Sequence, residues 1–437
     1  MPMLLAPLST ADALNHGCLC RTLNVARLRE QLETDPSLKG LAQDISATRP
    51  HLFSSTVVFI ASETADLISA TVAAIERVAA LPAYQAQALS RAPAIAQRAF
   101  GPVGACMGVD FHLGAAGPQL IEINTNAGGI LLNSALARAQ EACCQAMDWS
   151  FNPKSRRETL EPGLLGMFQS EWRLQRGNAP WRSVLIVDDD PSGQYLAPEF
   201  ALFEQLFRQA GVQARLADPR ELTWSEGQLM HAGTPVDMVY NRLTDFYLAD
   251  PDHQALRQAY EAGAVVLTPG PHAHAVFADK RNLIALSQQE GWADWGASPA
   301  DGQLLKAVVP RTELVTAEHA DDLWARRRHL FFKPVAGFGS KAAYRGDKLT
   351  RRVWGEILAG DFVAQALVPP SERLVDVDGV LTDLKFDLRA YCYAGQVQLL
   401  AARMYTGQTT NFRTQGGGFA PVMVLPPAAL TVVSPKP

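Results

Sequence analysis

Three side chains that can supply oxygen ligands stand in the segment DFHLGAAGPQLIEINTNAGG, which runs from Asp110 to Gly129. Glu122 and Asn124 follow an apolar run. Because residues two apart in a strand point to the same side, both can face one site, and a hairpin can bring Asp110 beside them. Carboxylate and amide oxygens are the hard ligands that suit Mg²⁺ bound to phosphates, so the segment predicts a magnesium site. The alternative is an edge hairpin whose acidic side chains are only solvated.

A second segment, FFKPVAGFGSKAAYRG (Phe331–Gly346), combines a lysine with a glycine-rich turn. Lys333 ends an apolar strand, where it can supply positive charge to phosphate groups. Glycines let backbone N–H groups turn inward and hold phosphate oxygens. The pattern is neither GxxxxGK[ST] nor GxGxxG, and a surface hairpin would give the same composition. The residues after the lysine that we expect to contact a phosphate-bearing cofactor are Gly337, Gly339, Ser340 and Lys341.

A third segment, near the end of the chain, has charged residues on one strand face and a polar loop after it. In KFDLRAYCYAG, Asp387 and Arg389 alternate with apolar residues, and Arg403 ends the next apolar run. The loop that follows contains Asn411, Arg413 and three consecutive glycines. A polar loop with an arginine suits closure over an anionic intermediate. A solvated sheet face would show the same alternation, so both interpretations stay open.

Helices and strands must position these segments, and hydrophobic periodicity indicates where they lie. Apolar residues at three-four spacing predict helices early in the chain, with a short β-rich run between them. Successive strands joined by short turns in the last third predict antiparallel pairing. The expected early helices are 24–34, 64–80, 92–100 and 133–147.

The middle of the chain alternates strands and helices, which predicts a parallel sheet with helices on both faces. In sheets of this kind, ligands bind beyond the carboxyl ends of the strands. Asp188, Asn241 and Arg242 hold such positions and are expected to contact substrate. Arg242 can bind a substrate carboxylate through two parallel hydrogen bonds. A surface ion pair is the alternative for this arginine.

The predicted fold class is α+β together with α/β, divided into three structural units and a linker. The ranges are 1–150 for an N-terminal helical region with the metal-binding strands, 151–180 for the linker, 181–285 for the doubly wound parallel-sheet domain, and 286–437 for the lysine segment and the remaining strands.

The composition restricts the class of protein. The chain has 437 residues, 48% of them hydrophobic, and a net charge of −5, so it can form large cores and is not expected to bind nucleic acid. Its six cysteines include no CxxC pair, and a reducing, cytoplasmic location is expected. No apolar run approaches about 18 residues and the start lacks a signal-peptide pattern, so no membrane contact is expected.

Taken together, the segments resemble the ATP-grasp superfamily, in particular the glutathione synthetase-like carboxylate–amine ligases. In that family a lysine strand with a glycine-rich loop, a hinge strand, a D-x-R strand, an arginine and an Asn-containing loop usually precede a D…E-x-N segment. Here the D…E-x-N segment comes first, at Asp110–Asn124, and the others follow in the usual order. The chain therefore resembles a circularly permuted ATP-grasp protein, related to the glutathionylspermidine synthase-like group, with the parallel-sheet domain ahead of the lysine segment.

The resemblance implies a nucleotide site with ATP and two Mg²⁺ ions. The hinge strand of the family corresponds to FVAQALV (Phe362–Val368), which would clamp adenine through backbone groups. The implied assignments are Asp110, Glu122 and Asn124 for magnesium; Lys280, Lys333, Gln365, Ala366 and Leu367 for ATP; Arg389, Arg403 and Asn411 for catalysis; and Asp387 and Arg413, with the three strand-end residues of the parallel sheet, for substrate.

The resemblance also implies a reaction, the ligation of a carboxylic acid to an amine through an acyl phosphate, with release of ADP and phosphate. Amino-acid, peptide and polyamine substrates are all compatible. The oligomeric state stays open, although a homodimer is common among such ligases. The alternatives are a small-molecule kinase on the same fold and a non-catalytic nucleotide-binding scaffold. Some relatives carry an arginine just before the metal-binding aspartate. Gly108 and its neighbours supply none, which leaves Arg98 or Arg413 to substitute for it.

Overall fold

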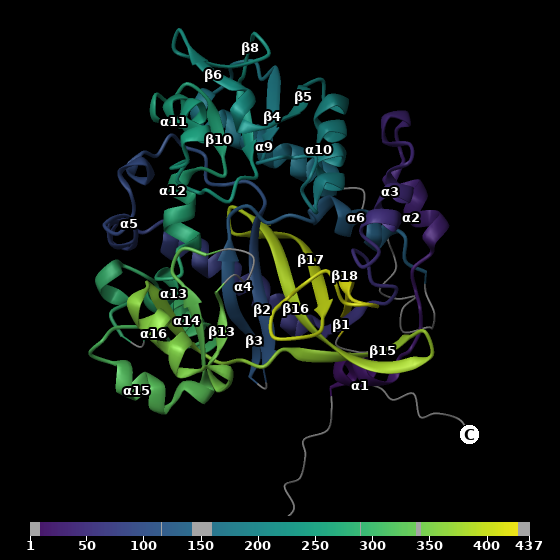
Figure 1. Ribbon diagram of the computed structural model, residues 1–437, viewed down its shortest axis with the longest axis vertical. Coiled ribbons are helices and arrows are strands. Elements are labelled where there is room, and N and C mark those ends of the chain that lie inside the picture. The colour runs from purple at the N-terminus through teal and green to yellow at the C-terminus, as the bar shows by residue number, and fades with distance from the viewer. Residues whose placement is uncertain (1–8, 115, 142–159, 289, 338–341, 427–437) are drawn as a thin grey trace, which may run out of the picture.

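The computed structural model describes residues 9–114, 116–141, 160–288, 290–337 and 342–426, and four sheets form within them. Figure 1 shows a parallel sheet with its helices at the top, a large sheet in the centre, and a small sheet with helices at the lower left. The large sheet therefore occupies the middle of the molecule.

The large sheet combines strands from both ends of the chain. Its order is β1-β18-β17-β16-β2-β3, and β15 also pairs with β16. The hairpin predicted from the acidic segment is present, and its first strand pairs antiparallel with β16 so that Asp110 lies opposite Arg389. The strands are β1 (Val58–Ala61), β2 (Met107–Gly114), β3 (Gly117–Asn124), β15 (Ser371–Val377), β16 (Val380–Tyr393), β17 (Gln396–Tyr405) and β18 (Gly418–Leu425).

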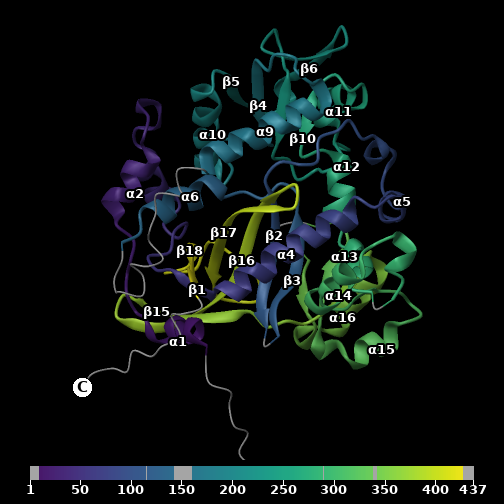
Figure 2. The same cartoon turned by 180° about the vertical axis from the view of Figure 1, so that it is seen from behind.

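The two faces of the large sheet differ because side chains alternate along its strands. Phe111, Leu388 and Ala402 are buried on one face, where they pack in the same core as α4 (Ser62–Ala79). Figure 2 shows α4 lying across this face. The charged members of the same strands point to the opposite face. The sheet therefore forms a core on one side and presents polar groups on the other.

A β-bulge in the hairpin directs its acidic side chains. Asp110 pairs with Glu122, but the next residue, Phe111, pairs with Leu120, so Ile121 is an extra residue in β3. Phe111 and Leu120 are buried on the helix-covered face. In a regular strand Leu120 and Glu122 would share that face. The bulge reverses the alternation and turns Glu122 to the polar face with Asp110.

The small sheet holds the lysine segment, and its strands pair antiparallel in the order β11-β14-β12-β13. Phe332 is buried against Trp354 of α16 (Arg351–Ala359). The neighbouring Phe331 and Lys333 therefore point to the other face of the sheet. The strands are β11 (Thr312–Leu314), β12 (Leu330–Pro334), β13 (Tyr344–Arg345) and β14 (Phe362–Ala366).

The middle of the chain forms the expected parallel sheet, in the order β10-β9-β4-β5. Helices cover both faces, since Phe168 and Phe203 lie in one core and Leu256 lies in the other. The elements are α9 (Leu160–Arg176), β4 (Ser183–Val187), α10 (Ala197–Gln209), β5 (Gln213–Ala217), β9 (Met238–Asn241), α11 (Gln254–Glu261) and β10 (Val266–Thr268).

The structure differs from the sequence prediction in and beside this domain. The expected linker, 151–180, contains α9, because Phe168 and Trp172 bury an apolar helix face in the core. Between β5 and β9 the chain forms a three-stranded antiparallel sheet, not a helix, because Glu226-Gly227 and Ala232-Gly233 adopt positive φ in tight turns. That sheet consists of β6 (Leu222–Ser225), β7 (Gln228–His231) and β8 (Thr234–Pro235).

Two expected helices are shorter or shifted. The helix expected at 92–100 is reduced to the 3₁₀ turn η2 (Ala94–Gln97), and α6 (Ile130–Arg138) begins before residue 133 and ends well before 147. Residues 142–159 lie outside the described ranges. Further helices are α1 (Thr10–Gly17), α2 (Val25–Leu32), α3 (Leu41–Thr48), α5 (Pro82–Leu89), α12 (Pro271–Ala273), the π-helix η5 (His274–Ala278), α13 (Asn282–Leu286), α14 (Pro299–Val308) and α15 (Ala320–Ala325).

Helix length and hydropathy bear on the expectation of no membrane contact. Within the ranges that the structure describes, no single helix is long and apolar enough to cross a bilayer. Helices α4 and α5 meet the requirement only as a pair, and the pair is bent by 78°. Ile68, Val72 and Ile75 of α4 are buried in the core of the large sheet.

Candidate functional site

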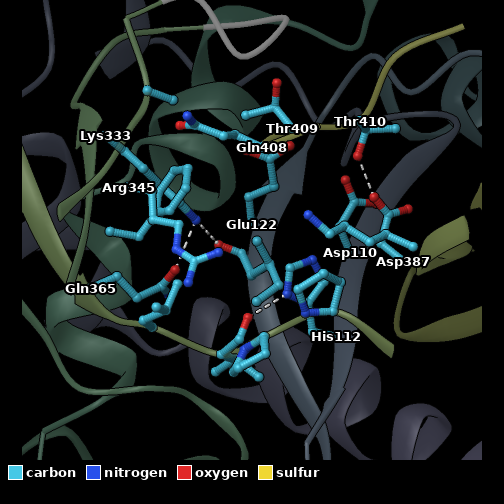
Figure 3. Close-up of a pocket in the computed structure, with 18 of the residues that line it drawn as sticks. Asp110, His112, Glu122, Lys333, Arg345, Gln365, Asp387, Gln408, Thr409 and Thr410 are labelled. Carbon is cyan, nitrogen blue, oxygen red and sulfur yellow. Dashed lines mark hydrogen bonds between the residues drawn. The ribbon is translucent and has the colours of Figure 1, made fainter. Parts of the chain in front are cut away.

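A pocket lies between the polar face of the large sheet and the small sheet, and we call it the central pocket. It contains about 1070 Å³ of space free of atoms, counting its open mouth. Figure 3 shows Lys333 and Gln365 on one side, Asp110 and Asp387 on the other, and Glu122 between them. The predicted site residues that line this pocket are Asp110, Glu122, Lys280, Lys333, Gly337, Gln365, Ala366, Leu367, Asp387 and Arg403.

Lys333 joins the small sheet to the acidic hairpin. Its Nζ donates to the Ile121 carbonyl oxygen at 2.7 Å and to Gln365 Oε1 at 2.8 Å. The first contact joins residues 212 positions apart and uses the bulged residue of β3. Burial lowers the pKa of Lys333 to about 8, although the nearby Glu122 acts to raise it. The lysine is therefore charged at neutral pH but held by neutral oxygens, which leaves its charge available to an anion.

Lys280 supplies a second cation from the end of the parallel-sheet domain. Its Nζ donates to the Gly337 carbonyl oxygen at 2.7 Å, at the start of the glycine-rich segment. Its charge also acts to lower the pKa of Lys333, since both amines face the same pocket. Two like charges on one pocket wall suit a ligand that carries several negative charges. The predicted phosphate contacts Gly339, Ser340 and Lys341 lie outside the described residues.

Asp110 is bound by two arginines on the polar face. Arg389 donates from Nε to Oδ1 and from Nη2 to Oδ2, each at 2.7 Å, and Arg403 Nη2 donates to Oδ2 at 2.8 Å. Arg403 Nε also donates to Asp387 at 2.7 Å, and the Thr410 hydroxyl donates to the same carboxylate. Burial alone would raise the pKa of Asp110, but the two guanidinium groups outweigh it and hold the pKa well below its usual range.

The cation beside Asp110 therefore comes from a neighbouring strand and not from the residues before it. Arg389 crosses over Gly108, where a Cβ atom would come within 3.2 Å of Arg389 Nε. Arg98 bonds to a backbone carbonyl elsewhere, and the Arg413 side chain is exposed. Neither of these two expected substitutes lines the central pocket.

Glu122 and Asn124 retain donor atoms that fit a magnesium ion. The Glu122 carboxylate faces the pocket and accepts a hydrogen bond from Asn124 Nδ2 at 3.2 Å. The same Nδ2 donates to Asp110 at 3.2 Å, and a half-turn of the amide would present Oδ1 instead. Asp110 could join such an ion only if an arginine moved away. Across the described ranges, no group of three His, Cys, Asp or Glu residues is arranged for a metal ion.

Residues 366–368, at the end of β14 and just after it, form one edge of the pocket. Among the described residues, one of their backbone N–H groups has no backbone partner. The N–H groups of Ala366 and Leu367 bond to backbone carbonyls at 2.8 Å. In the part of the chain that the structure describes, the Val368 N–H has no backbone partner. Gln365 is occupied by its bond to Lys333. The Val368 N–H is therefore a backbone donor at this edge that is left for a ligand.

Most polar groups of the strand-end residues bond inside the fold, although the buried Arg242 Nε has no hydrogen-bond partner among the described residues. Asn241 Nδ2 donates to a backbone carbonyl at 3.1 Å, and Arg242 Nη1 donates to the Ala127 carbonyl and the Tyr240 hydroxyl at 3.3 Å. Burial raises the pKa of Asp188 to about 7. None of the three predicted substrate residues lines the central pocket.

The polar loop after β17 reaches the pocket only through Gln408, Thr409 and Thr410. Asn411 is turned into the loop, where its Oδ1 accepts a hydrogen bond from the Arg413 N–H at 3.0 Å. Its Nδ2 donates to a backbone carbonyl of the same loop at 2.9 Å. Asn411 therefore orders the loop, and the structure does not bring it or Arg413 to the pocket.

Sequence reasoning missed several pocket residues. His112 follows Asp110 by two positions, so the same strand alternation could have identified it. Arg345 gave no such signal, because its strand has only two residues and its partner Phe331 lies on another strand. The other lining residues that were not assigned are Phe331, Pro334, Ala343, Pro369, Pro370, Lys385, Tyr405, Gln408, Thr409 and Thr410, together with Ile121.

Comparison with known proteins supports the fold. No protein-family model and no curated protein match the sequence. Among solved structures, a glutathione synthetase-like effector from Globodera pallida matches with a TM-score of 0.51 and 11% identity, over 92% of this chain and 98% of that chain. A γ-glutamylcysteine synthetase-like protein from Methylobacillus flagellatus has a TM-score of 0.46 and 12% identity, over 81% of this chain and 85% of that chain. The chain has the fold of the glutathione synthetase-like effector, and the ATP-grasp fold predicted from the sequence is confirmed.

Proposed function

We propose that the chain is an ATP- and Mg²⁺-dependent ligase that joins a carboxylic acid to an amine. The observation that carries the proposal is the bond from Lys333 to the Ile121 carbonyl, which brings the late lysine to the early acidic hairpin in one pocket. Lysines on one wall and carboxylates on the other suit phosphates that bind together with a metal ion. The fold shared with a glutathione synthetase-like effector supports the same class of reaction.

The nucleotide would lie along the pocket from the hinge to the charged groups. The Val368 N–H would bind the adenine edge, and Lys280 and Lys333 would neutralise phosphate charge. Glu122 and Asn124 would hold magnesium, which when bound supplies positive charge to the terminal phosphate oxygens. This placement uses only groups that line the pocket or bond directly to its carboxylates.

The reaction would take two steps. An oxygen of the substrate carboxylate attacks the γ-phosphorus, the bond to the β,γ-bridging oxygen breaks, and an acyl phosphate forms as ADP leaves. The amine then attacks the acyl carbon, loses a proton, and displaces phosphate. Arg403 lines the pocket and can stabilise the negative charge that develops in both steps. Gln408, Thr409 and Thr410 would limit the access of water to the acyl phosphate.

We also propose that the chain is a circular permutation of the usual ATP-grasp order. The acidic hairpin precedes the lysine segment in the chain, yet β2 lies beside β16 in one sheet. A single change in where the chain starts would give this order without altering the strand arrangement.

The function is tested by ADP release from the purified chain with Mg²⁺ and panels of acids and amines, with hydroxylamine as a trap. A ligase gives ADP that depends on the acid, and a hydroxamate when hydroxylamine replaces the amine. A stable phosphorylated alcohol would instead show a kinase. Nucleotide binding with no turnover across the panels would show a non-catalytic scaffold.

The variant Glu122→Gln tests the role of the carboxylate that we propose to hold magnesium. Turnover should fall by about 100- to 1000-fold, because the charge that faces the phosphates is lost. The unfolding midpoint should stay the same, since Glu122 accepts a hydrogen bond that the glutamine oxygen can still accept. Turnover equal to that of the unmodified chain would remove Glu122 from the site.

A further inference from the structure

His112 lies on the polar face of β2, two residues after Asp110, and lines the central pocket. Its Nδ1 is 2.7 Å from the Val368 carbonyl oxygen, just beyond the hinge strand. The sequence motifs assigned it no role. The ring therefore connects the acidic hairpin to the hinge, and Figure 3 shows it on the pocket wall below Glu122, with the bond from its ring drawn as a dashed line.

The bond to Val368 determines which ring nitrogen carries the proton. A carbonyl oxygen only accepts hydrogen bonds, so Nδ1 must be the donor, and in the neutral ring Nε2 then has a free lone pair. Among the described residues Nε2 has no hydrogen-bond partner, and it is not one of the fully enclosed atoms. Nε2 is therefore an acceptor that is open to the pocket.

The position of His112 along the pocket indicates which part of a nucleotide it meets. The free N–H of Val368 marks the base end, and Asp110 and Glu122 mark the phosphate end. His112 bonds to Val368 at one end and is about 7 Å along the strand from Asp110 at the other. In a nucleotide, the sugar lies between the base and the phosphates. An acceptor between the base end and the phosphate end of the pocket therefore faces the sugar hydroxyls, which are hydrogen-bond donors.

We propose that His112 recognises the ribose of the bound nucleotide: Nδ1 holds the Val368 carbonyl in place, and Nε2 accepts a hydrogen bond from a ribose hydroxyl. This inference rests on the proposed function, because it requires a nucleotide in the central pocket. Glu372 is the first carboxylate after the hinge and the obvious competitor for this role. Its side chain is exposed and it does not line the pocket.

The two ring nitrogens can be tested separately. His112→Asn places an amide nitrogen close to the position of Nδ1, so the bond to Val368 is kept and the second acceptor is lost. His112→Gln reaches the position of Nε2 with an amide oxygen and gives up the bond to Val368. Glu372→Gln is the matched control on the neighbouring hinge segment.

The experiment measures dissociation constants for ATP, 2′-deoxyATP and 3′-deoxyATP with Mg²⁺ by calorimetry, together with unfolding midpoints. The unmodified chain should bind ATP about tenfold more tightly than at least one deoxynucleotide, as expected for one buried hydrogen bond. His112→Asn should bind ATP and that deoxynucleotide equally, at the weaker level. His112→Gln should weaken all three nucleotides but keep the preference. Glu372→Gln should keep both the affinity and the preference.

Several results would overturn the assignment. A preference for ATP that persists in His112→Asn, or that disappears in Glu372→Gln, would place ribose recognition elsewhere. Equal binding of all three nucleotides to the unmodified chain would overturn the ribose role alone and leave the nucleotide pocket standing. If the unmodified chain binds no nucleotide, the proposed function fails, and the inference fails with it.

Discussion

The central pocket and the carboxyl ends of the parallel sheet both contain buried charged residues, but the two regions use them differently. In the pocket, Lys333 bonds to neutral oxygens, and Glu122 faces open space. At the strand ends, Arg242 bonds to groups of the fold itself. Glu199 beside it accepts hydrogen bonds from the N–H groups at the start of α6, at 2.6 and 3.0 Å.

The difference lies in whether a charged group opens on the pocket, where a ligand can reach it, as Lys333 and Glu122 do and Arg242 does not. A charged group that is held by neutral partners and opens on a pocket can take a ligand without breaking the fold. A charged group that bonds to the protein itself stabilises the fold. Arg242 bonds to a backbone carbonyl and a hydroxyl, and Glu199 accepts hydrogen bonds from the start of α6. In the sequence, both regions were predicted from polar residues at the ends of strands. That position alone does not show whether a charged residue is available to a ligand or bonded within the fold. Substitution in each region should therefore affect different properties.

Lys333→Met should have the largest effect, and on activity. ATP turnover should fall by about 100- to 1000-fold, because the charge that we propose to face the phosphates is lost. The unfolding midpoint should stay the same or rise, since burial already disfavours the charged lysine, as its lowered pKa shows. ADP release and denaturant unfolding measure the two quantities. A marked loss of stability would show that Lys333 is a structural residue, and the central pocket would then not differ from the strand ends in this respect.

Arg242→Met should show the opposite pattern. The free energy of unfolding should fall by about 2–4 kcal/mol, because the buried Glu199 and the nearby Asp188 lose the cation that offsets their burial. The affinity for ATP should not change. Denaturant unfolding and ATP calorimetry measure these effects, with Arg242→Lys as the charge-retaining control. A parallel loss of ATP affinity would show that the strand ends belong to the proposed nucleotide site.

The pH dependence of nucleotide binding is the third test. Burial lowers the pKa of Lys333 from 10.5 to about 8; Glu122 and Asp110 oppose this, and Lys280 reinforces it. Above that pKa the empty site loses its positive charge, whereas a bound anion favours the charged form. ATP affinity should therefore fall as pH rises through about 8, by at most about tenfold per pH unit.

The loss of the Lys333 proton also affects the stability of the nucleotide-free protein. Stability should rise with pH, whereas ATP affinity should fall. Between about pH 8 and the ordinary pKa of 10.5, the folded chain binds fewer protons at Lys333 than the unfolded chain, so this group makes stability rise with pH. Lys333→Arg does not titrate in this range and should flatten both curves. A slope in ATP affinity that survives in Lys333→Arg would belong to another group.

Thr410→Val should have the smallest effect. It removes the hydroxyl that donates to Asp387 and so loosens the carboxylate that holds Arg403. Loss of one such bond should reduce turnover by about threefold to tenfold and leave ATP affinity unchanged. Steady-state kinetics with Thr410→Ser as the control measure this. A fall in ATP affinity without a fall in turnover would move Thr410 from the reaction to nucleotide binding.

Much of the framework could be predicted from the sequence because it depends on local patterns. Alternation and apolar runs located the acidic hairpin, the lysine strand, the hinge and the four parallel strands. The linker and one crossover were wrong, because burial of α9 and the turns of the three-stranded sheet depend on distant packing and on positive φ angles. Strand geometry alone did not indicate the extra residue at Ile121.

The candidate site could be predicted only in part. Lys333, Glu122 and the hinge carry recognisable residue types at recognisable places. Arg389 and Arg403 were also identified, but not as partners of Asp110, because they reach it across a sheet whose register joins strands nearly three hundred positions apart in the chain. His112 follows from strand alternation, but its role depends on the Val368 carbonyl, which only the folded chain brings near.

The sequence by itself determined where residue types suited to phosphate and metal occur, and the order in which their strands follow, because residue type and periodicity are properties of short segments. The tertiary structure decided which of those side chains are free to act. Strand register, one β-bulge and the packing of one domain on another place Lys333 and Glu122 at an open pocket, and they enclose Asn241 and Arg242 within the fold. The physical reason is that a charge must be balanced wherever it is buried, and only the assembled chain shows whether a ligand or the protein itself balances it.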